Sequence, residues 1–125
     1  MTDLHALIIE DEVQVACLVE EALRGSGYRS FDVAFSASEA LEAARRRCPD
    51  LITADLRLVD GTGVDAVLEI CSENPIPVVF ITANPAEISR RIPDAIIVEK
   101  PFLISGVEGA LAQAVRTPFL SPAAR

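Results

Sequence analysis

The chain has 125 residues, 24% charged and 50% hydrophobic, and its 19 acidic against 11 basic residues leave a formal net charge of −8. This balance excludes disordered and low-complexity classes and predicts one soluble folded domain, without room for a second DNA-binding or catalytic module. The acidic excess repels phosphate backbones and anionic membranes, so we expect no direct nucleic acid or membrane partner, whereas multivalent cations are favoured.

The three cysteines, Cys17, Cys48 and Cys71, form no C-x-x-C pair and are odd in number, which argues against a disulfide framework or a zinc site. Each falls on an apolar helical stripe and is expected to be a buried free thiol. No apolar run approaches the length of a membrane span, and the N-terminus lacks the pattern of a signal peptide. We therefore expect a cytoplasmic protein.

The first half of the chain predicts two strand-helix units. Leu4–Ile9 is an apolar run typical of a buried strand. A helical stripe follows at Val15, Val19, Ala22 and Leu23. Ser30–Phe35 predicts a second strand, and Ser36 with Glu39 matches the capping box of a second helix. The basic run Arg45–Arg47 falls in the last turn of that helix, where cations oppose the macrodipole, so we interpret it as structural.

The alternation of strands and helices continues to the end of the chain. Leu51–Asp55 predicts a third strand, followed by a loop at residues 58–63 and a helical stripe from Val64 to Cys71. Val78–Thr82 and Ala95–Glu99 predict the fourth and fifth strands.

The fourth helix is expected to be short. Only residues 83–94 separate the last two strands, and two prolines bound a helix of about two turns there. A last apolar stripe runs from Ile104 to Val115, and residues 117–125 predict a frayed tail. Five strands alternating with five helices predict an α/β domain, a doubly wound parallel sheet with helices on both faces.

Polar side chains stand where these strands end: Glu10 and Asp11, Asp55, Thr82 and Lys100. Each alone has a structural explanation, but together they would meet at the carboxyl edge of the sheet, where such folds bind ligands. Clustered carboxylates call for a cation, and hard oxygen ligands favour Mg²⁺. An Asp there could form an aspartyl phosphate, stabilised by the metal, the ammonium and the hydroxyl.

Four motifs carry a family resemblance, at Leu7–Glu12, Pro49–Leu58, Phe80–Ala83 and Val98–Phe102. In this order the motifs resemble the receiver domain of two-component response regulators, and the resemblance covers about residues 4–116. It implies a flavodoxin-like sheet in the order 2-1-3-4-5. A receiver domain over residues 1–118 and a C-terminal tail over residues 119–125 are expected.

The resemblance implies that Asp55 accepts a phosphoryl group from a phosphohistidine. Asp11, Asp55 and the backbone carbonyl of Arg57 would bind Mg²⁺ directly, and Glu10 would act through water.

By the same resemblance, Thr82 and Lys100 would contact the phosphoryl group, and the peptide bond between Lys100 and Pro101 is expected to be cis. His5, the only histidine, is expected to serve packing or to lie at the surface.

The resemblance also implies partners for a stand-alone response regulator. The phosphodonor would be a sensor histidine kinase or a histidine phosphotransfer protein. The chain would catalyse only its own phosphorylation and dephosphorylation. Output would pass to a separate effector protein or onward in a phosphorelay, with a phosphorylation-dependent dimer possible.

Two features depart from the family pattern. Ile97 stands where receivers carry an aromatic residue, and Lys100 follows Thr82 by 18 residues, a short interval whose loss falls on the fourth helix. We hypothesise that phosphorylation reorders Asn84–Pro93. Arg57 either tunes the attack of water on the phosphoryl group or pairs with the acidic rim.

Two competing functions are open to test. The run Val59–Gly63 is similar to a signature of haloacid-dehalogenase-type phosphatases, but Leu58 stands where their nucleophilic Asp is required. A phosphorylation-independent interaction module with the same fold is the remaining alternative. It gives no physical reason for clustered carboxylates.

Overall fold

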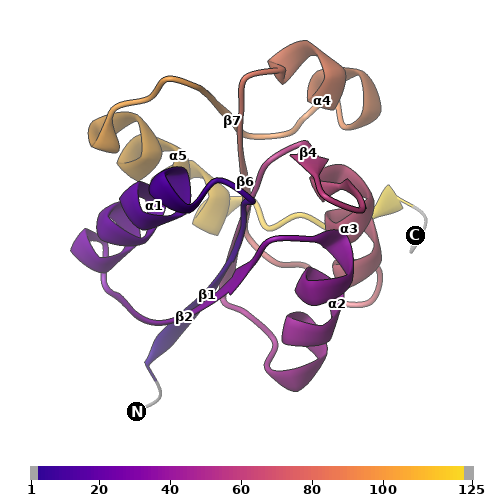
Figure 1. Ribbon diagram of the computed structural model, residues 1–125, viewed down its shortest axis with the longest axis horizontal. Coiled ribbons are helices and arrows are strands. Elements are labelled where there is room, and N and C mark those ends of the chain that lie inside the picture. Colours follow the sequence, from indigo (N-terminus) through magenta and orange to yellow (C-terminus); the bar gives the residue numbers. More distant parts are fainter. Residues whose placement is uncertain (1–2, 123–125) are drawn as a thin grey trace.

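The computed structural model describes residues 3–122, which form a five-stranded parallel sheet with helices on both faces (Figure 1). The strands of this sheet are β1 (Leu4–Ile9), β2 (Tyr28–Ala34), β3 (Leu51–Ala54), β6 (Val78–Thr82) and β7 (Ile97–Glu99). Their order is β2-β1-β3-β6-β7, and every neighbouring pair is parallel. Because β6 and β7 are the fourth and fifth strands of the sheet, the expected order 2-1-3-4-5 is confirmed.

The helices divide between the two faces of the sheet. They are α1 (Val13–Gly25), α2 (Ala37–Arg46), α3 (Gly63–Ile70), α4 (Pro85–Arg91) and α5 (Ile104–Arg116). One core cluster joins the sheet to α1 and α5, and the other joins it to α2, α3 and α4 (Figure 1). Among the helices of residues 3–122, none combines the length and hydrophobicity needed to cross a membrane.

Strand β1 shows why the sheet is buried on both faces. Ala6 and Ile8 pack into the cluster on the α1 and α5 side, whereas Leu7 and Ile9 pack into the opposite cluster. Successive side chains of a strand point to opposite faces, so a strand covered on both sides is apolar without interruption. The predicted buried strand is confirmed, and it ends where the polar residues begin.

The start of α2 follows the predicted capping pattern in modified form. The Ser36 hydroxyl accepts a hydrogen bond from the Glu39 amide at 3.2 Å, as expected. The Glu39 carboxylate accepts from the Phe35 amide at 2.7 Å, one residue before the amide that a strict capping box uses. Arg45 and Arg46 lie in the last turn of this helix as predicted, whereas Arg47 is its C-cap residue and donates to the Ser30 hydroxyl at 3.0 Å.

A small hairpin replaces part of the loop predicted at residues 58–63. Strands β4 (Arg57–Leu58) and β5 (Gly61–Thr62) pair antiparallel, and Thr62 caps α3 by accepting a hydrogen bond from the Asp65 amide at 3.1 Å. Gly61 has a φ of 149°, which favours glycine at the turn. This hairpin connects β3 to α3 beside the carboxyl edge of the sheet.

The segment after α5 does not fray as predicted, at least as far as Ser121. Phe119 and Ile76 exchange two backbone hydrogen bonds of 2.8 and 3.0 Å. The Ser121 amide donates to the Cys71 carbonyl at 3.0 Å, and Ser121 is buried. The prediction of a frayed tail over residues 117–125 is therefore wrong as far as Ser121, because backbone groups of this stretch pair with the connection between α3 and β6. Residues 123–125 lie outside the described residues.

The cysteines differ from one another in burial. Cys71 is buried as expected, and burial raises the pKa of its thiol to about 12. Cys17 and Cys48 are exposed, so their predicted burial is wrong. Cys48 follows the end of α2 at Arg46, and Cys17 lies on the solvent side of α1, next to the buried Ala16.

Candidate functional site

The carboxyl ends of three strands bring the predicted site residues to one edge of the sheet. Glu10 directly follows β1, Asp55 follows β3, and Lys100 follows β7. Backbone hydrogen bonds fix this register: the Asp55 amide donates to the Ile9 carbonyl at 3.0 Å, and the Lys100 amide donates to the Thr82 carbonyl at 2.9 Å. The sheet itself therefore positions these side chains.

The Lys100 ammonium lies at the centre of the site. Its Nζ is 2.8 Å from Glu10 Oε1, 2.9 Å from Asp55 Oδ2 and 3.4 Å from Glu12 Oε1. The Lys100 and Asp55 side chains are 12% and 11% exposed, so their charges interact with little screening from solvent. The second Asp55 oxygen, Oδ1, accepts a hydrogen bond from the Leu56 amide at 2.7 Å.

The pKa values of Glu10 and Lys100, which form an ion pair, are both raised but for different reasons. Burial raises the pKa of Glu10, and the hydrogen bond from Lys100 opposes that rise without cancelling it. Burial alone would lower the pKa of Lys100, but its hydrogen bonds to Glu10 and Asp55 outweigh burial and raise it. Lys100 is therefore a fixed positive charge, held in place by carboxylates.

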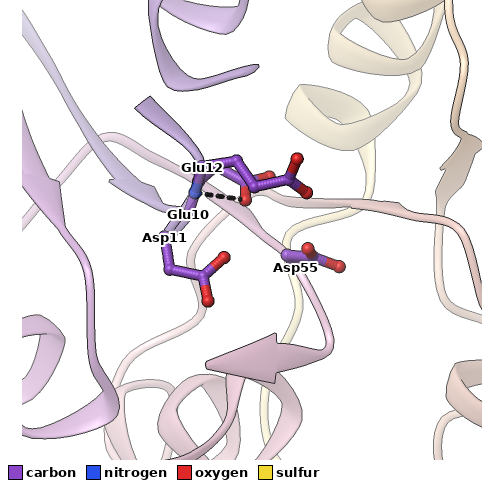
Figure 2. A group of neighbouring side chains, drawn as sticks. All are labelled: Glu10, Asp11, Glu12 and Asp55. Atoms are coloured by element: carbon purple, nitrogen blue, oxygen red, sulfur yellow. Dashed lines mark hydrogen bonds between the residues drawn. The ribbon is translucent and has the colours of Figure 1, made fainter. Parts of the chain in front are cut away.

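Four carboxylates gather around this edge. Glu10, Asp11, Glu12 and Asp55 each offer a carboxylate oxygen, and these oxygens lie within 4.8 Å of one another. Figure 2 shows the side chains together, with the Glu12 amide donating to Glu10 Oε2 at 3.1 Å. Lys100 supplies only one positive charge against four carboxylates, so the cluster has room for a further cation. Mg²⁺, which prefers hard oxygen ligands, fits this donor set.

Thr82 lies at the end of β6 and is fully buried. Its hydroxyl oxygen accepts a hydrogen bond from the Asn84 amide at 3.0 Å. Asn84 is the N-cap residue of α4, so the hydroxyl at the edge of the sheet contacts the start of that helix. The expected cis peptide bond between Lys100 and Pro101 is present and follows β7.

The side chain of Arg57 points toward α4. Its guanidinium is 3.0 Å from Glu87 Oε1, in the first turn of that helix. An ion pair of Arg57 with a Glu or Asp of the acidic rim is one of its two predicted roles. The structure has an ion pair with a Glu, but this residue, Glu87, lies on α4. The backbone carbonyl of Arg57 as a metal ligand stays a prediction.

Two contributors to the site escaped sequence reasoning. Glu12 contacts Lys100, although only Glu10 and Asp11 of this acidic run are predicted site residues. Gly63 packs so closely on the loop that a Cβ atom there would overlap the carbonyl oxygen of Asp55, and its amide donates to the Leu56 carbonyl at 2.8 Å. Glycine at the start of a helix is a weak sequence signal for such a contact.

The hairpin after Asp55 is tied to α2 through Asp60. The Asp60 carboxylate accepts from the Ala37 amide at 2.6 Å and from the Ser38 hydroxyl at 2.8 Å. The hydrogen bonds from Ser38 and Ala37 hold the pKa of Asp60 below its usual value. The match to a phosphatase signature at this run thus corresponds to a structural contact between hairpin and helix.

Comparison with known families gives a match to the response regulator receiver domain over residues 6–96. The phyllosphere-induced regulator PhyR of Methylorubrum extorquens is 37% identical over 87% of this chain and 42% of that protein. The transcriptional regulatory protein PdtaR of Mycobacterium tuberculosis is 35% identical over 89% of the chain and 56% of that protein. The chain thus spans about half the length of these curated relatives.

Solved structures show the same similarity. The receiver domain of the Erythrobacter litoralis PhyR response regulator aligns with a TM-score of 0.85 at 33% identity, covering 94% of both chains. The response regulator PhyR from Brucella abortus aligns with a TM-score of 0.82 at 34% identity, over 92% of this chain and 49% of that one. A Bartonella quintana PhyR, described as an anti-anti-sigma factor, aligns with a TM-score of 0.79 at 32% identity, over 93% and 49% of the two chains.

Proposed function

Because the chain belongs to the family of response regulator receiver domains, we propose that Asp55 accepts a phosphoryl group from a phosphohistidine. The observation that carries this proposal is the position of Lys100, whose Nζ lies 2.9 Å from Asp55 Oδ2. A fixed cation beside a carboxylate is suited to stabilising negative charge that develops on a phosphoryl group. The donor would be a sensor histidine kinase or a histidine phosphotransfer protein.

In the proposed reaction, an Asp55 carboxylate oxygen attacks phosphorus. The new oxygen-phosphorus bond forms as the phosphorus-nitrogen bond of the phosphohistidine breaks, and the imidazole leaves with the bond's electron pair and takes up a proton. Lys100 compensates the charge of the transferred group. The Thr82 hydroxyl, whose oxygen accepts from the Asn84 amide, still has its own hydrogen to donate to the transferred group. The Leu56 amide, 2.7 Å from Asp55 Oδ1, holds the nucleophile in orientation.

We propose Mg²⁺ as the cofactor, held by Asp11, Asp55 and the Arg57 carbonyl, with Glu10 acting through water. Glu12 belongs to the same group of carboxylates and is an additional candidate. When bound, Mg²⁺ would supply positive charge to phosphoryl oxygens and reduce the repulsion among the carboxylates.

The downstream partner is proposed to be a protein. A net charge of −8 disfavours direct contact with nucleic acid, and the likeness to a PhyR described as an anti-anti-sigma factor supports signalling between proteins. The free cysteines Cys17, Cys48 and Cys71 support a location in the cytoplasm. The packing of Phe119 and Ser121 supports extending the receiver unit beyond residue 118.

Binding of beryllofluoride in the presence of Mg²⁺, followed by fluorine NMR, tests the proposed function. The wild type is expected to give a signal of bound beryllofluoride, and Asp55→Asn to give none. Asp94→Asn, an exposed substitution of the same chemistry away from the site, is the matched control and should bind as the wild type does. Absence of binding by the wild type would favour the phosphorylation-independent interaction module.

A further inference from the structure

We propose that Arg57 exchanges Glu87 for the phosphoryl group of Asp55, and that this exchange releases the first turn of α4. The inference rests on the proposed function, because it requires phosphorylation of Asp55. It adds a named coupling element, the Arg57–Glu87 ion pair, which connects the acceptor site to a helix 30 residues further along the chain.

The first turn of α4 depends on contacts from the acceptor site. The helix is seven residues long, and its N-cap residue Asn84 makes no side-chain capping bond within the described structure. Two contacts hold this end: the Asn84 amide donates to the Thr82 hydroxyl at 3.0 Å, and Glu87 pairs with Arg57 at 3.0 Å. Both outside partners, Thr82 and Arg57, belong to the acceptor site or directly follow it.

The last turn of α4 is held independently of the acceptor site. Arg91 pairs with Asp65 of α3 at 2.7 Å, and Asp65 also accepts a hydrogen bond from the Thr62 hydroxyl at 2.8 Å. Ile88 and Ile92 are buried in the core on the α2 and α3 side. The helix therefore has one end tied to the site and one end tied to the body of the domain.

The chemistry of the partners favours the exchange. A phosphoryl group carries about two negative charges at neutral pH, and the planar guanidinium of Arg binds its oxygens through two parallel hydrogen bonds. Glu87 offers one negative charge. The Arg57 side chain is 68% exposed and Arg57 follows Asp55 by two residues, so solvent rather than packed side chains surrounds it as it turns.

The exposed ion pair is weak enough to be switched. Pairs of this kind change an equilibrium by about two- to fivefold, so the first turn is held in the unphosphorylated protein without being locked. Coupling between two equilibria is reciprocal. If the phosphoryl group breaks the Arg57–Glu87 pair, then removal of Glu87 must favour binding at Asp55, whereas removal of Arg57 must disfavour it.

Amide hydrogen exchange of α4 tests the release, using the full chain with and without Mg²⁺ and beryllofluoride. In the wild type, the analogue is expected to raise amide exchange at residues 86–88 by about two- to fivefold, Pro85 having no amide hydrogen. Glu87→Gln and Arg57→Gln should show this higher exchange already without the analogue. The control Arg90→Gln removes the same charge as Arg57→Gln, from an exposed α4 side chain outside the ion pairs of the described residues, and should behave as the wild type does.

Beryllofluoride affinity separates this exchange from a merely structural role of the pair. Glu87→Gln is expected to bind the analogue about two- to fivefold more tightly than the wild type, and Arg57→Gln more weakly by a similar factor. Equal shifts in the same direction for both variants would overturn the proposal. Unchanged amide exchange of α4 in the wild type, with bound analogue visible by fluorine NMR, would also overturn the proposal. That result would leave the proposed function intact. A wild type that binds no analogue would overturn both.

Discussion

The charged groups at the two ends of the parallel sheet differ in how far their charges are compensated by neighbours. Near the start of β1, the buried His5 has Nε2 2.9 Å from Asp32 Oδ2 and Nδ1 2.8 Å from the Ser30 hydroxyl. The His5 amide donates to the Asp50 carboxylate at 2.8 Å. Arg47 donates in turn to the Ser30 hydroxyl at 3.0 Å. Each group in this network has a nearby partner of matching chemistry.

The carboxyl end of the sheet concentrates charge of one sign. Four carboxylates have oxygens within 4.8 Å of one another, and three of them, Glu10, Glu12 and Asp55, pair with the Lys100 ammonium. A satisfied network stabilises a fold, whereas clustered like charges oppose it unless a ligand adds compensating charge. The groups at the amino end therefore stabilise one another, whereas the carboxyl end has an excess of negative charge that the proposed Mg²⁺ would compensate.

The largest expected effect comes from Gly63, which packs on the backbone of Asp55. Gly63→Ala should lower the free energy of unfolding by about 3 kcal/mol, because the added Cβ displaces the acceptor loop. Denaturant unfolding measures this effect. Gly109→Ala on α5 is the matched control. Its added Cβ meets open space, and the free energy of unfolding should rise by about 1 kcal/mol because alanine favours the helix. Equal effects at both positions would contradict the close contact at Asp55.

The response to Mg²⁺ should be specific to the carboxyl end. At a Mg²⁺ concentration ten times its dissociation constant, the free energy of unfolding of the wild type should rise by about 1.4 kcal/mol. Asp55→Asn should lose most of this gain, because it removes a carboxylate from the cluster. Thermal unfolding with and without Mg²⁺ measures it, and Asp32→Asn at the other end should keep the full gain. A gain shared by every variant would point to nonspecific ion effects.

Removal of one charge should have opposite signs at the two ends. Asp32→Asn weakens the contact with buried His5 and should lower the free energy of unfolding by about 1 kcal/mol. Asp11→Asn removes one of the repelling carboxylates and should raise it by about 0.5 kcal/mol in metal-free buffer. Denaturant unfolding of both variants at the same ionic strength checks this contrast. Two effects of the same sign would break the comparison.

The smallest expected effect is the pH dependence of the Asp65 contact. The hydrogen bond from Arg91, followed by that from Thr62, lowers the pKa of Asp65 below its usual 3.8. The folded state therefore favours the carboxylate, and this stabilisation is present above pH 3.8 and lost as the pH falls through the lowered pKa.

Because the Asp65 side chain is 60% exposed, solvent screens the contact, and we expect about 0.5 kcal/mol. The difference in unfolding free energy between wild type and Asp65→Asn at pH 7 should therefore disappear in strong acid. A difference that persists there would show that the carboxylate charge is not its source.

Much of the sheet and its carboxyl edge could be predicted from the sequence. Apolar runs such as Val78–Thr82 are strands in the structure, and parallel strands necessarily bring their ends together. Glu10, Asp55 and Lys100 therefore meet although they are far apart in the chain. This part of the structure follows from periodicity and topology, which one sequence contains.

The contacts that escaped prediction depend on packing between distant or weakly patterned segments. Phe119 pairs with Ile76 in a proline-bounded tail that has no strand pattern. Arg57 pairs with Glu87 on α4, and the position of this helix beside the loop after Asp55 has no signal in the sequence. The close approach of Gly63 to Asp55 depends on the path of the whole loop. Such features follow from tertiary structure rather than from local propensity.

The most direct test of the central claim is the intact mass of the chain after incubation with Mg²⁺ and a small phosphodonor. The wild type should gain the mass of one phosphoryl group, and hydroxylamine should remove it, because the linkage is an acyl phosphate on Asp55. Asp55→Asn should gain nothing, and Asp94→Asn should behave as the wild type does. A gain that persists in Asp55→Asn, or a wild type that stays unmodified, would contradict the assignment of Asp55 as the phosphoryl acceptor.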